Sequence, residues 1–386
     1  MRSIGADLKK VKSGEHLPAL DGVRGLAVLI VVAFHTGGGA QSANPIGRPI
    51  GLTLKAGWSG VTLFFVLSGF LITGILWDSK GVPHWGRNFY VRRVLRISPL
   101  YYASLLLILI LSWLLHNRPA GSRSLWIYAL YLQNIPWIAD RGVGLRPLPL
   151  THFWSLAVEE QFYLVWPLLL HKLKTFSQVK HVCLAIFLSS IAFRCAVWTL
   201  SSQPEVYNGF LLSRAGELAI GGYLAMCFRD GSWDRLQRIS PYLTVASLAG
   251  FLVVCAPSRI FELTNIACAT AGLAFITLFY AGLIVLALAD GLVHRATSVA
   301  WLRWVGGISY GIYVFHILLQ PMYGWLAQVL VPHAGRVEAI AVRGALTWVL
   351  TAGVAWVSYR YFESPILGLR RYFGRSRQTA ELTEPA

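Results

Sequence analysis

The chain has 386 residues, of which 55% are hydrophobic and only 13% are charged, and its mean hydropathy is +0.56. This composition excludes an ordinary soluble globular protein and indicates a polytopic helical protein whose surroundings are the lipid bilayer. The net charge of +17 does not indicate a nucleic-acid partner. Its basic residues lie in short loops between apolar segments, where such residues set membrane topology.

Ten apolar segments are long enough to cross about 30 Å of hydrocarbon, which takes about 20 helical residues. A further segment at 125–138 is shorter and contains Asn134 and Pro136, so we expect it to be re-entrant or interfacial. The ten expected spans are 22–39, 58–78, 97–115, 152–171, 181–200, 209–228, 241–257, 264–289, 304–330 and 343–362.

The distribution of basic residues favours ten spans over eleven. With ten spans and an inside amino terminus, 22 of the 34 Lys and Arg residues fall on the cytoplasmic side, nine outside and three within spans. Counting 125–138 as a full span would invert the later loops. We therefore expect both termini in the cytoplasm, with an N-terminal segment at 1–17, a membrane domain at 18–367 and a basic, then disordered tail at 368–386.

The first span, ALDGVRGLAVLIVVAFHT, carries Arg24 near its start and His35 near its end. Eleven residues make three helical turns plus about 20°, so the two side chains share one face and lie about 16 Å apart along the axis. Because charge is costly against lipid, this face is expected to meet protein or water. The alternative is that His35 only caps the span at its outer end.

The second span, GWSGVTLFFVLSGFLIT, places Ser59, Gly60, Ser68 and Gly69 among bulky apolar residues. Small residues allow two helices to approach closely, so this pattern predicts a packing interface within the membrane.

A basic stretch, RNFYVRRVLRISPLYY, follows at the inner surface. Arg92, Arg93 and Arg96 fall within about one helical turn of each other. Guanidinium groups match phosphate oxygens, so the cluster predicts a polyanion site. Anchoring to lipid headgroups is the alternative.

Two acidic residues, Glu159 and Glu160, lie about seven residues inside the span THFWSLAVEEQFYLVWPLL. Carboxylates at that depth are costly unless they are protonated, paired or hydrated. Adjacent helical positions point about 100° apart, so at most one of the two can face His35. The alternative is a structural ion pair with Arg194 or Arg214.

Later in the chain, VGGISYGIYVFHILLQP carries Tyr310, Tyr313 and His316. Tyr313 and His316 are three residues apart and are therefore neighbours on a helix, where backbone carbonyls could satisfy both without any function.

These five stretches, in this order, resemble the membrane-bound acyltransferase-3 family, which includes O-antigen and other polysaccharide O-acetylases. The resemblance extends from Leu17 to about Leu367. It implies a ten-span enzyme of the bacterial inner membrane that moves an acyl group, usually acetyl, from cytoplasmic acetyl-CoA or another acyl-CoA to a hydroxyl of a cell-surface or lipid-linked glycan. It implies the stand-alone form of the family, without an added soluble domain, and no metal.

The resemblance also implies roles for particular residues. The essential arginine and histidine of the family's first helix fall on Arg24 and His35, and its basic RxxR motif falls on Arg93 and Arg96. His35 is then the general base, because neutral imidazole can take a hydroxyl proton near pH 7. Arg24 is the further catalytic candidate, either to position the donor or to stabilise the oxyanion. The remaining candidates are Glu160 as the carboxylate that orients His35, Arg92 and Tyr101 at the acyl-CoA site with Arg93 and Arg96, and Glu159, Asp21, Tyr310 and His316 around the catalytic residues.

Other functions remain open at this stage. The acceptor could be a macrolide or another small secondary metabolite. A transporter or flippase of a polar lipid would also use arginine, glutamate and histidine within the membrane. Direct transfer and an acyl-histidine intermediate both fit the residues, and we favour direct transfer because no cysteine or serine lies beside His35 in the sequence.

Overall fold

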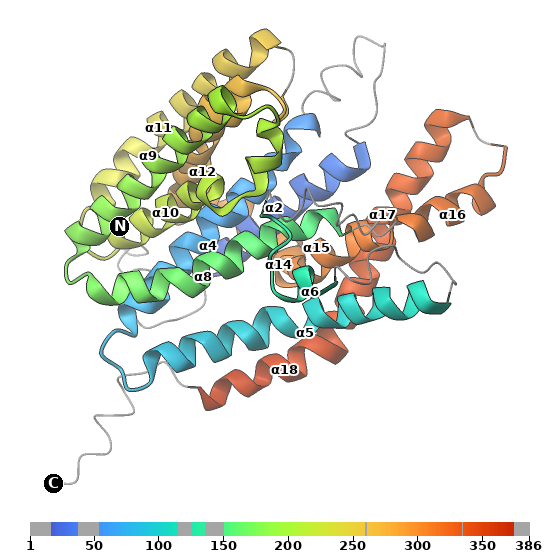
Figure 1. The fold of residues 1–386 in the computed structure, drawn as a ribbon, viewed down its shortest axis with the longest axis horizontal. Coiled ribbons are helices and arrows are strands. Elements are labelled where there is room, and N and C mark those ends of the chain that lie inside the picture. Colours follow the sequence, from blue (N-terminus) through green and yellow to red (C-terminus); the bar gives the residue numbers. More distant parts are fainter. Residues whose placement is uncertain are drawn as a thin grey trace.

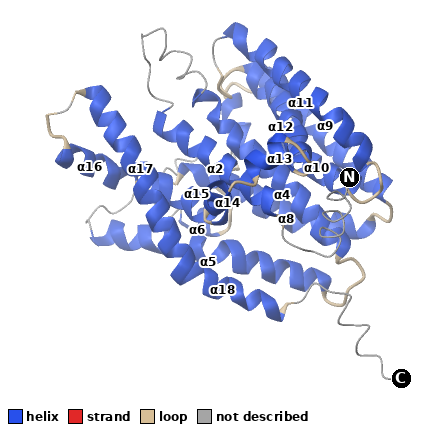
Figure 2. Cartoon of the chain, turned by 180° about the vertical axis from the view of Figure 1, so that it is seen from behind, coloured by secondary structure: helices blue, strands red, loops and turns tan. Residues whose placement is uncertain are grey.

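The computed structural model describes residues 17–37, 54–114, 125–135, 150–258, 261–333 and 335–373, and every regular element within these ranges is a helix (Figures 1 and 2). The expected all-helical fold class is therefore confirmed. Residues 1–16 of the expected N-terminal segment, residues 374–386 of the tail and residues 136–138 of the expected interfacial segment lie outside the described residues.

Seven helices of the described chain are long and apolar enough to cross a membrane, which supports a multi-pass protein, and the expected count of ten spans is not confirmed. Four of the seven begin within five residues of an expected span, and the helices that begin at Arg336, Trp233 and Trp85 start seven, eight and twelve residues earlier than expected. The seven are α2 (Pro18–Gly37), η1 with α4 (Ala56–Trp58, Ser59–Asp78), α5 (Trp85–Leu114), α9 (Phe176–Leu200), α11 (Trp233–Cys255), η6 with α12 (Cys268–Gly272, Leu273–Ala287), and α17 (Arg336–Ser358) with its continuation.

The other three expected spans are helical but differ from simple apolar rods. The α8 helix (Trp154–Lys172) carries the two glutamates, and α10 (Leu211–Cys227) has only 17 residues. Segment 304–330 is broken into α14 (Ala300–Gly307), α15 (Ser309–Leu318) and α16 (Gln320–Leu330). Pro321 lies in the first turn of the last of these helices, where proline is tolerated, and the residue that caps this helix, Leu319, is not helical.

Close helix packing at the centre depends on glycine. A Cβ atom on Gly69 of α4 would lie 1.8 Å from the Leu218 carbonyl oxygen of α10, and one on Gly221 would lie 2.0 Å from the Val66 oxygen. The same is true where α2 meets α14, because a Cβ on Gly306 would lie 1.8 Å from the Asp21 oxygen. The sequence prediction of a small-residue interface is thus confirmed at Gly69, while Ser68 has a different role described below.

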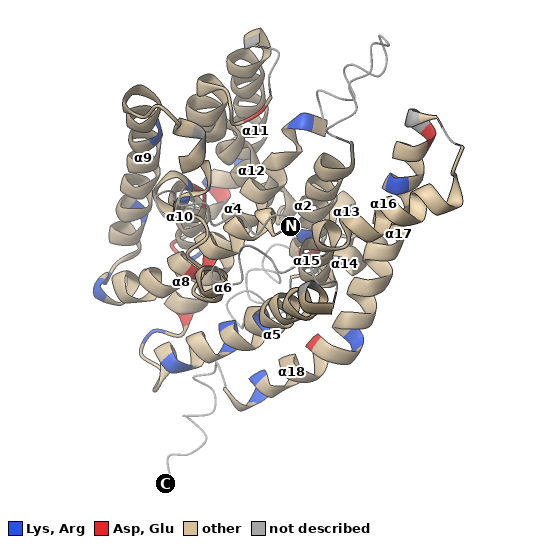
Figure 3. Ribbon diagram, turned by 45° about the vertical axis from the view of Figure 1, so that its right-hand side comes forward, with Lys and Arg blue, Asp and Glu red and all other residues tan. Residues whose placement is uncertain are grey.

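The C-terminal helical segment packs along α5. It consists of η7 (Tyr359–Glu363), α18 (Ser364–Gly368) and η8 (Leu369–Tyr372), and Figure 1 shows α18 beside α5 at one edge of the molecule. Arg92 Nε donates a hydrogen bond to the Phe373 carbonyl oxygen. Helical structure therefore continues past residue 367, and Figure 3 shows Lys and Arg residues on α5 and on the turns that flank α18.

Candidate active site

A cavity of about 1230 Å³ lies between α2, α4, α5, α8 and α15. Its wall contains eight basic and only three acidic side chains, so it carries an excess of positive charge. The basic residues are Arg24, Lys80, Arg92, Arg93, Arg96, Lys174, Arg229 and Arg370. Such an excess in a concave site attracts and holds anions.

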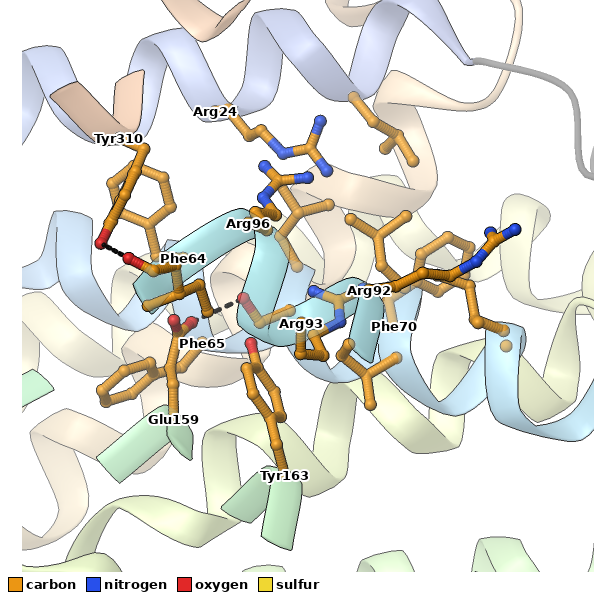
Figure 4. A pocket seen from close by; sticks show the side chains of 18 of the residues that line it. Arg24, Phe64, Phe65, Phe70, Arg92, Arg93, Arg96, Glu159, Tyr163 and Tyr310 are labelled. Atoms are coloured by element: carbon orange, nitrogen blue, oxygen red, sulfur yellow. Dashed lines mark hydrogen bonds between the residues drawn. The ribbon is translucent and has the colours of Figure 1, made fainter. Parts of the chain in front are cut away.

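Arginines from two helices converge on this cavity. Figure 4 shows Arg24 of α2 and Arg96 of α5 pointing toward one another, with Arg93 further along α5. Asp21 accepts a hydrogen bond of 2.7 Å from Arg24 and so offsets part of the charge. The Arg93 guanidinium lies 5.5 Å from the ring centre of Tyr163, an aromatic contact that helps to fix its position.

The rim of the cavity adds cations from other parts of the chain. Burial and the neighbouring Lys174 lower the pKa of Lys80, which donates to the Leu170 carbonyl oxygen at 3.2 Å. Arg229 forms a two-pronged hydrogen bond with Asp78, at 2.7 and 2.5 Å. The bidentate pair holds the Arg229 side chain at the wall, directly against Gly74.

Glu159 is the acidic residue of α8 that faces the cavity. Its Oε1 accepts a hydrogen bond of 2.6 Å from Ser68, and Arg93 and Arg96 act on it electrostatically. Figure 4 shows Glu159 and Tyr163 extending from α8 toward the arginines. Ser68 is therefore a hydrogen-bond donor at the cavity wall rather than only a small packing residue.

His35 does not line the cavity; it pairs with His316. The distance from His35 Nδ1 to His316 Nε2 is 3.2 Å, and the two rings meet edge to face with centroids 5.0 Å apart. His35 is exposed, whereas His316 is completely buried. The pair thus lies between the protein interior and the surface.

The hydrogen bonds assign the protons of this pair. His316 Nδ1 lies 2.7 Å from the Tyr313 carbonyl oxygen, and His35 Nδ1 lies 2.9 Å from that of Val31. A carbonyl only accepts, so in the neutral rings both Nδ1 atoms carry hydrogen. His316 Nε2 is then an acceptor facing His35 Nδ1–H, and His35 Nε2 keeps its lone pair.

Tyr313 connects the histidine pair to the cavity. Its ring lines the cavity, its carbonyl oxygen binds His316, and its hydroxyl donates to the His152 carbonyl oxygen at 2.7 Å. The same hydroxyl hydrogen-bonds Ser155, which also lines the wall. The cavity and the histidines are therefore adjacent parts of one site.

Of the residues singled out in the sequence, the structure brings most to this site and leaves two outside. Tyr101 is completely buried, and its hydroxyl donates to the Tyr128 carbonyl oxygen at 2.7 Å, away from the cavity wall. Glu160 also points away from the cavity, and His35 hydrogen-bonds His316 in its place. At the cavity are Arg24, Asp21, Arg92, Arg93, Arg96, Glu159 and Tyr310.

The alternative ion pair between an α8 glutamate and Arg194 or Arg214 is wrong. Arg214 Nε lies 3.0 Å from Glu217 Oε1, one helical turn along α10, and both side chains are about 1% exposed. Arg194 donates to the Ser213 carbonyl oxygen at 2.6 Å. Arg214 is thus paired with a glutamate of its own helix, α10, and Glu159 faces the cavity.

Sequence reasoning missed several wall residues. Lys80, Lys174, Arg229 and Arg370 lie in loops or at helix ends far apart in the sequence, where basic residues fit an ordinary cytoplasmic surface. Of these four, Arg370 alone could have been noticed in the sequence, because it begins the basic stretch that follows the last expected span. In the described chain, no group of three His, Cys, Asp or Glu side chains is arranged to hold a metal ion.

The chain is similar to known proteins along most of its length. A family described as an acyltransferase domain matches residues 17–360. The peptidoglycan O-acetyltransferase OatA of Listeria monocytogenes is 28% identical over 94% of this chain and 58% of its own length. The putative peptidoglycan O-acetyltransferase YrhL of Bacillus subtilis is 27% identical over 92% and 56%, and the O-acetyltransferase OatA of Staphylococcus aureus is 28% identical over 93% and 58%.

The chain thus spans somewhat more than half the length of the curated relatives it matches. No solved structure matches the fold significantly.

Proposed function

Because the chain belongs to the acyltransferase-3 family, we propose that it is a membrane O-acyltransferase that moves an acyl group, usually acetyl, from cytoplasmic acyl-CoA to a glycan hydroxyl. The single observation that carries this proposal is the cation-lined cavity that ends beside the His35–His316 pair. The named activities of the relatives make peptidoglycan the first acceptor to test.

The cavity suits an acyl-CoA donor. Its arginines and lysines match the phosphate groups of CoA, and guanidinium forks bind phosphate oxygens in pairs. Except for Arg24, the basic residues of the cavity lie in segments outside the expected spans. Because such residues concentrate in cytoplasmic segments, these segments are predicted to lie on the cytoplasmic side of the inner membrane. The phosphates would then stay at the cytoplasmic rim while the thioester extends toward the histidines, with both chain termini in the cytoplasm.

The chemistry follows from the assigned protons. A glycan hydroxyl oxygen attacks the thioester carbonyl carbon while His35 Nε2 takes the hydroxyl proton. The Val31 carbonyl and His316 Nε2 accept from His35 Nδ1–H and stabilise the imidazolium, the role that the carboxylate has in a serine-protease triad. The C–S bond then breaks, and the proton passes from His35 to the CoA sulfur, which leaves an ester and the free thiol.

Arg24 belongs to the donor part of this mechanism. Its eleven-residue separation from His35 corresponds to about 16 Å along α2, too far for both to contact one reacting carbonyl. Its neighbours at the cavity are Asp21 and the arginines of α5. We therefore assign it to holding the donor rather than to stabilising the oxyanion.

The experiment that tests the function uses purified protein, radiolabelled acetyl-CoA and peptidoglycan fragments. We expect label to appear in the glycan as an ester that mild alkali releases. Proton-coupled uptake of a polar lipid into proteoliposomes without any transfer of label would instead identify a transporter.

Arg370 provides a test of the cavity rim. The Arg370→Ala variant is expected to bind CoA about tenfold more weakly in calorimetry, since a hydrogen bond to a charged group contributes about 1.5–3 kcal/mol. Arg371→Ala is the matched control, because Arg371 contacts Tyr372 and does not line the cavity. Equal loss in the two variants would indicate a general effect of charge instead of a contact at the rim.

His316 is expected to act as a positioning residue. The His316→Ala variant should lower kcat about 10- to 100-fold and leave CoA affinity unchanged, because it removes the acceptor that faces His35 Nδ1–H. His316→Gln restores an acceptor atom and should recover part of kcat. If the two variants were equally inactive and bound CoA poorly, His316 would be needed only for packing.

A further inference from the structure

A second group of polar side chains lies between α5, residues 125–135 and α8, and it includes Glu160, which points about 100° around α8 from Glu159. We call it the outer polar cluster, and it consists of Ser98, Tyr131, Gln133 and Glu160. The Tyr131 ring stacks on the buried Tyr101 ring with centroids 4.3 Å apart. Beyond the stacked rings, Gln133 Nε2 donates to the Phe153 carbonyl oxygen at 2.9 Å.

Contacts with α8 hold residues 131–134 in place. Gln161 Nε2 donates to the Tyr131 carbonyl oxygen and to Asn134 Oδ1, both at 2.7 Å. Asn134 Nδ2 in turn donates to the Gly209 carbonyl oxygen at 3.2 Å. The cluster is therefore anchored through its backbone and amides to two other elements.

Three atoms of the cluster are buried and have no hydrogen-bond partner in the described part of the chain. They are Glu160 Oε1, Gln133 Oε1 and Tyr131 Oη. Ser98 lies close to the Tyr131 hydroxyl, but the two do not form a well-directed hydrogen bond. Buried polar atoms without hydrogen-bond partners destabilise a fold, so three such atoms together indicate that a ligand or water binds there.

The environment of Tyr131 is unusual in two further ways. Its φ is +54°, a left-handed conformation that is rare for a bulky side chain and that clusters at binding and active sites. Burial and the nearby Glu160 carboxylate raise the pKa of its phenol. Tyr131 therefore stays neutral and keeps a hydroxyl that can both donate and accept.

The chemistry of the three atoms selects the ligand. An amide oxygen and a carboxylate oxygen only accept, and the phenol does both, so the complementary ligand presents several hydroxyl donors. A sugar has such hydroxyls close together. The cluster also adjoins the donor cavity, because Tyr310, which lines the cavity, donates to the carbonyl oxygen of Ile97, the neighbour of Ser98.

From this geometry we infer that the outer polar cluster binds hydroxyl groups of the sugar acceptor. The inference rests on the proposed transfer to a glycan. It gives Glu160 a role in holding the acceptor instead of orienting His35, and it assigns Tyr131 and Gln133 to the same site.

The test compares two tyrosine variants that each lose one hydroxyl. Tyr131→Phe removes an atom with no partner in the described chain, whereas Tyr102→Phe removes a hydroxyl that donates to the Ala129 carbonyl oxygen at 2.9 Å. We expect Tyr131→Phe to raise the KM for peptidoglycan fragments at least fivefold with unchanged CoA affinity and Tm. Tyr102→Phe should lower Tm and leave the KM unchanged.

Glu160→Gln gives an independent measurement, because it keeps the size of the side chain. We expect it to raise the KM for peptidoglycan fragments with little change in kcat, and a fall in kcat alone would assign Glu160 to His35 instead. Unchanged KM in both Tyr131→Phe and Glu160→Gln would show that only water fills the cluster and would overturn the inference.

Calorimetry with unlabelled peptidoglycan fragments separates this inference from the proposed function. Binding by the wild-type protein that Tyr131→Phe weakens would support the site even if no label were transferred from acetyl-CoA. If the wild-type protein bound no fragment, the inference would be overturned even where acetyl-CoA still bound normally.

Discussion

Replacing His35 by alanine is expected to reduce acetyl transfer by about 10²- to 10⁴-fold, the usual contribution of a general base. His35 Nε2 is the atom that keeps a lone pair, because Nδ1 is committed to the Val31 carbonyl and to His316. The measurement is the transfer of label from acetyl-CoA to peptidoglycan fragments under conditions that saturate the donor. CoA affinity should not change, since His35 lies outside the cavity that holds the donor.

A histidine elsewhere in the chain provides the matched control. His181 on α9 has the same local geometry, with Nδ1 2.8 Å from the carbonyl oxygen four residues earlier, but it lies on an exposed face. His181→Ala should therefore transfer label at the wild-type rate. Transfer by His35→Ala at a comparable rate would contradict the mechanism and return His35 to the role of a cap on α2.

The rate of acetyl transfer should depend on pH, because His35 can accept a proton only while its imidazole ring is neutral. Transfer is expected to decline as the pH falls, because the imidazole of His35 then takes up a proton and can no longer act as a base. The decline should disappear from the residual activity of His35→Ala, because no titrating base remains at that position.

Replacing both Arg93 and Arg96 by alanine is expected to weaken CoA binding about 100-fold, which corresponds to about 3 kcal/mol. The two side chains line the cavity together with Arg24, and the rings of Phe89 and Tyr163 hold Arg93 in place. Calorimetry with CoA measures the change. The affinity of the wild-type protein should also fall with added salt, since part of the attraction comes from charges near water.

The control for this pair lies on the same helix. Arg87 is in the first turn of α5, is exposed and does not line the cavity, so Arg87→Ala should bind CoA with nearly wild-type affinity. Dephospho-CoA, which lacks one phosphate, adds a second comparison. Full CoA affinity in the double variant would remove Arg93 and Arg96 from the donor site and favour a role in binding lipid headgroups.

Local periodicity allowed the main elements to be predicted from the sequence. Arg24 and His35 lie on one continuous helix, and the arginines of α5 lie within about one turn, because helical spacing is set by neighbouring residues. Most expected spans also match helices. The break within 304–330 was missed because long apolar segments read alike whether they form one helix or three.

The partners of the functional side chains were decided by tertiary packing. His316 lies 281 residues from His35 in the sequence, and only the contact of α15 with α2 brings them to 3.2 Å. Of the two adjacent glutamates, the rotation of α8 turns Glu159 toward the cavity and Glu160 toward the outer polar cluster. A sequence shows that neighbouring helical positions point apart, but it does not show which neighbour each one meets.

The sequence by itself determined an all-helical chain with several long apolar helices and with an arginine and a histidine spaced to share one face of the first helix. Composition and periodicity are local properties, and they are sufficient to predict helices and the residues that share a helical face. Only the tertiary structure brought Arg370 to the rim of the cavity, joined His35 to His316 and separated Glu159 from Glu160. These relations depend on how the helices are rotated and packed against one another, which no short stretch of sequence specifies.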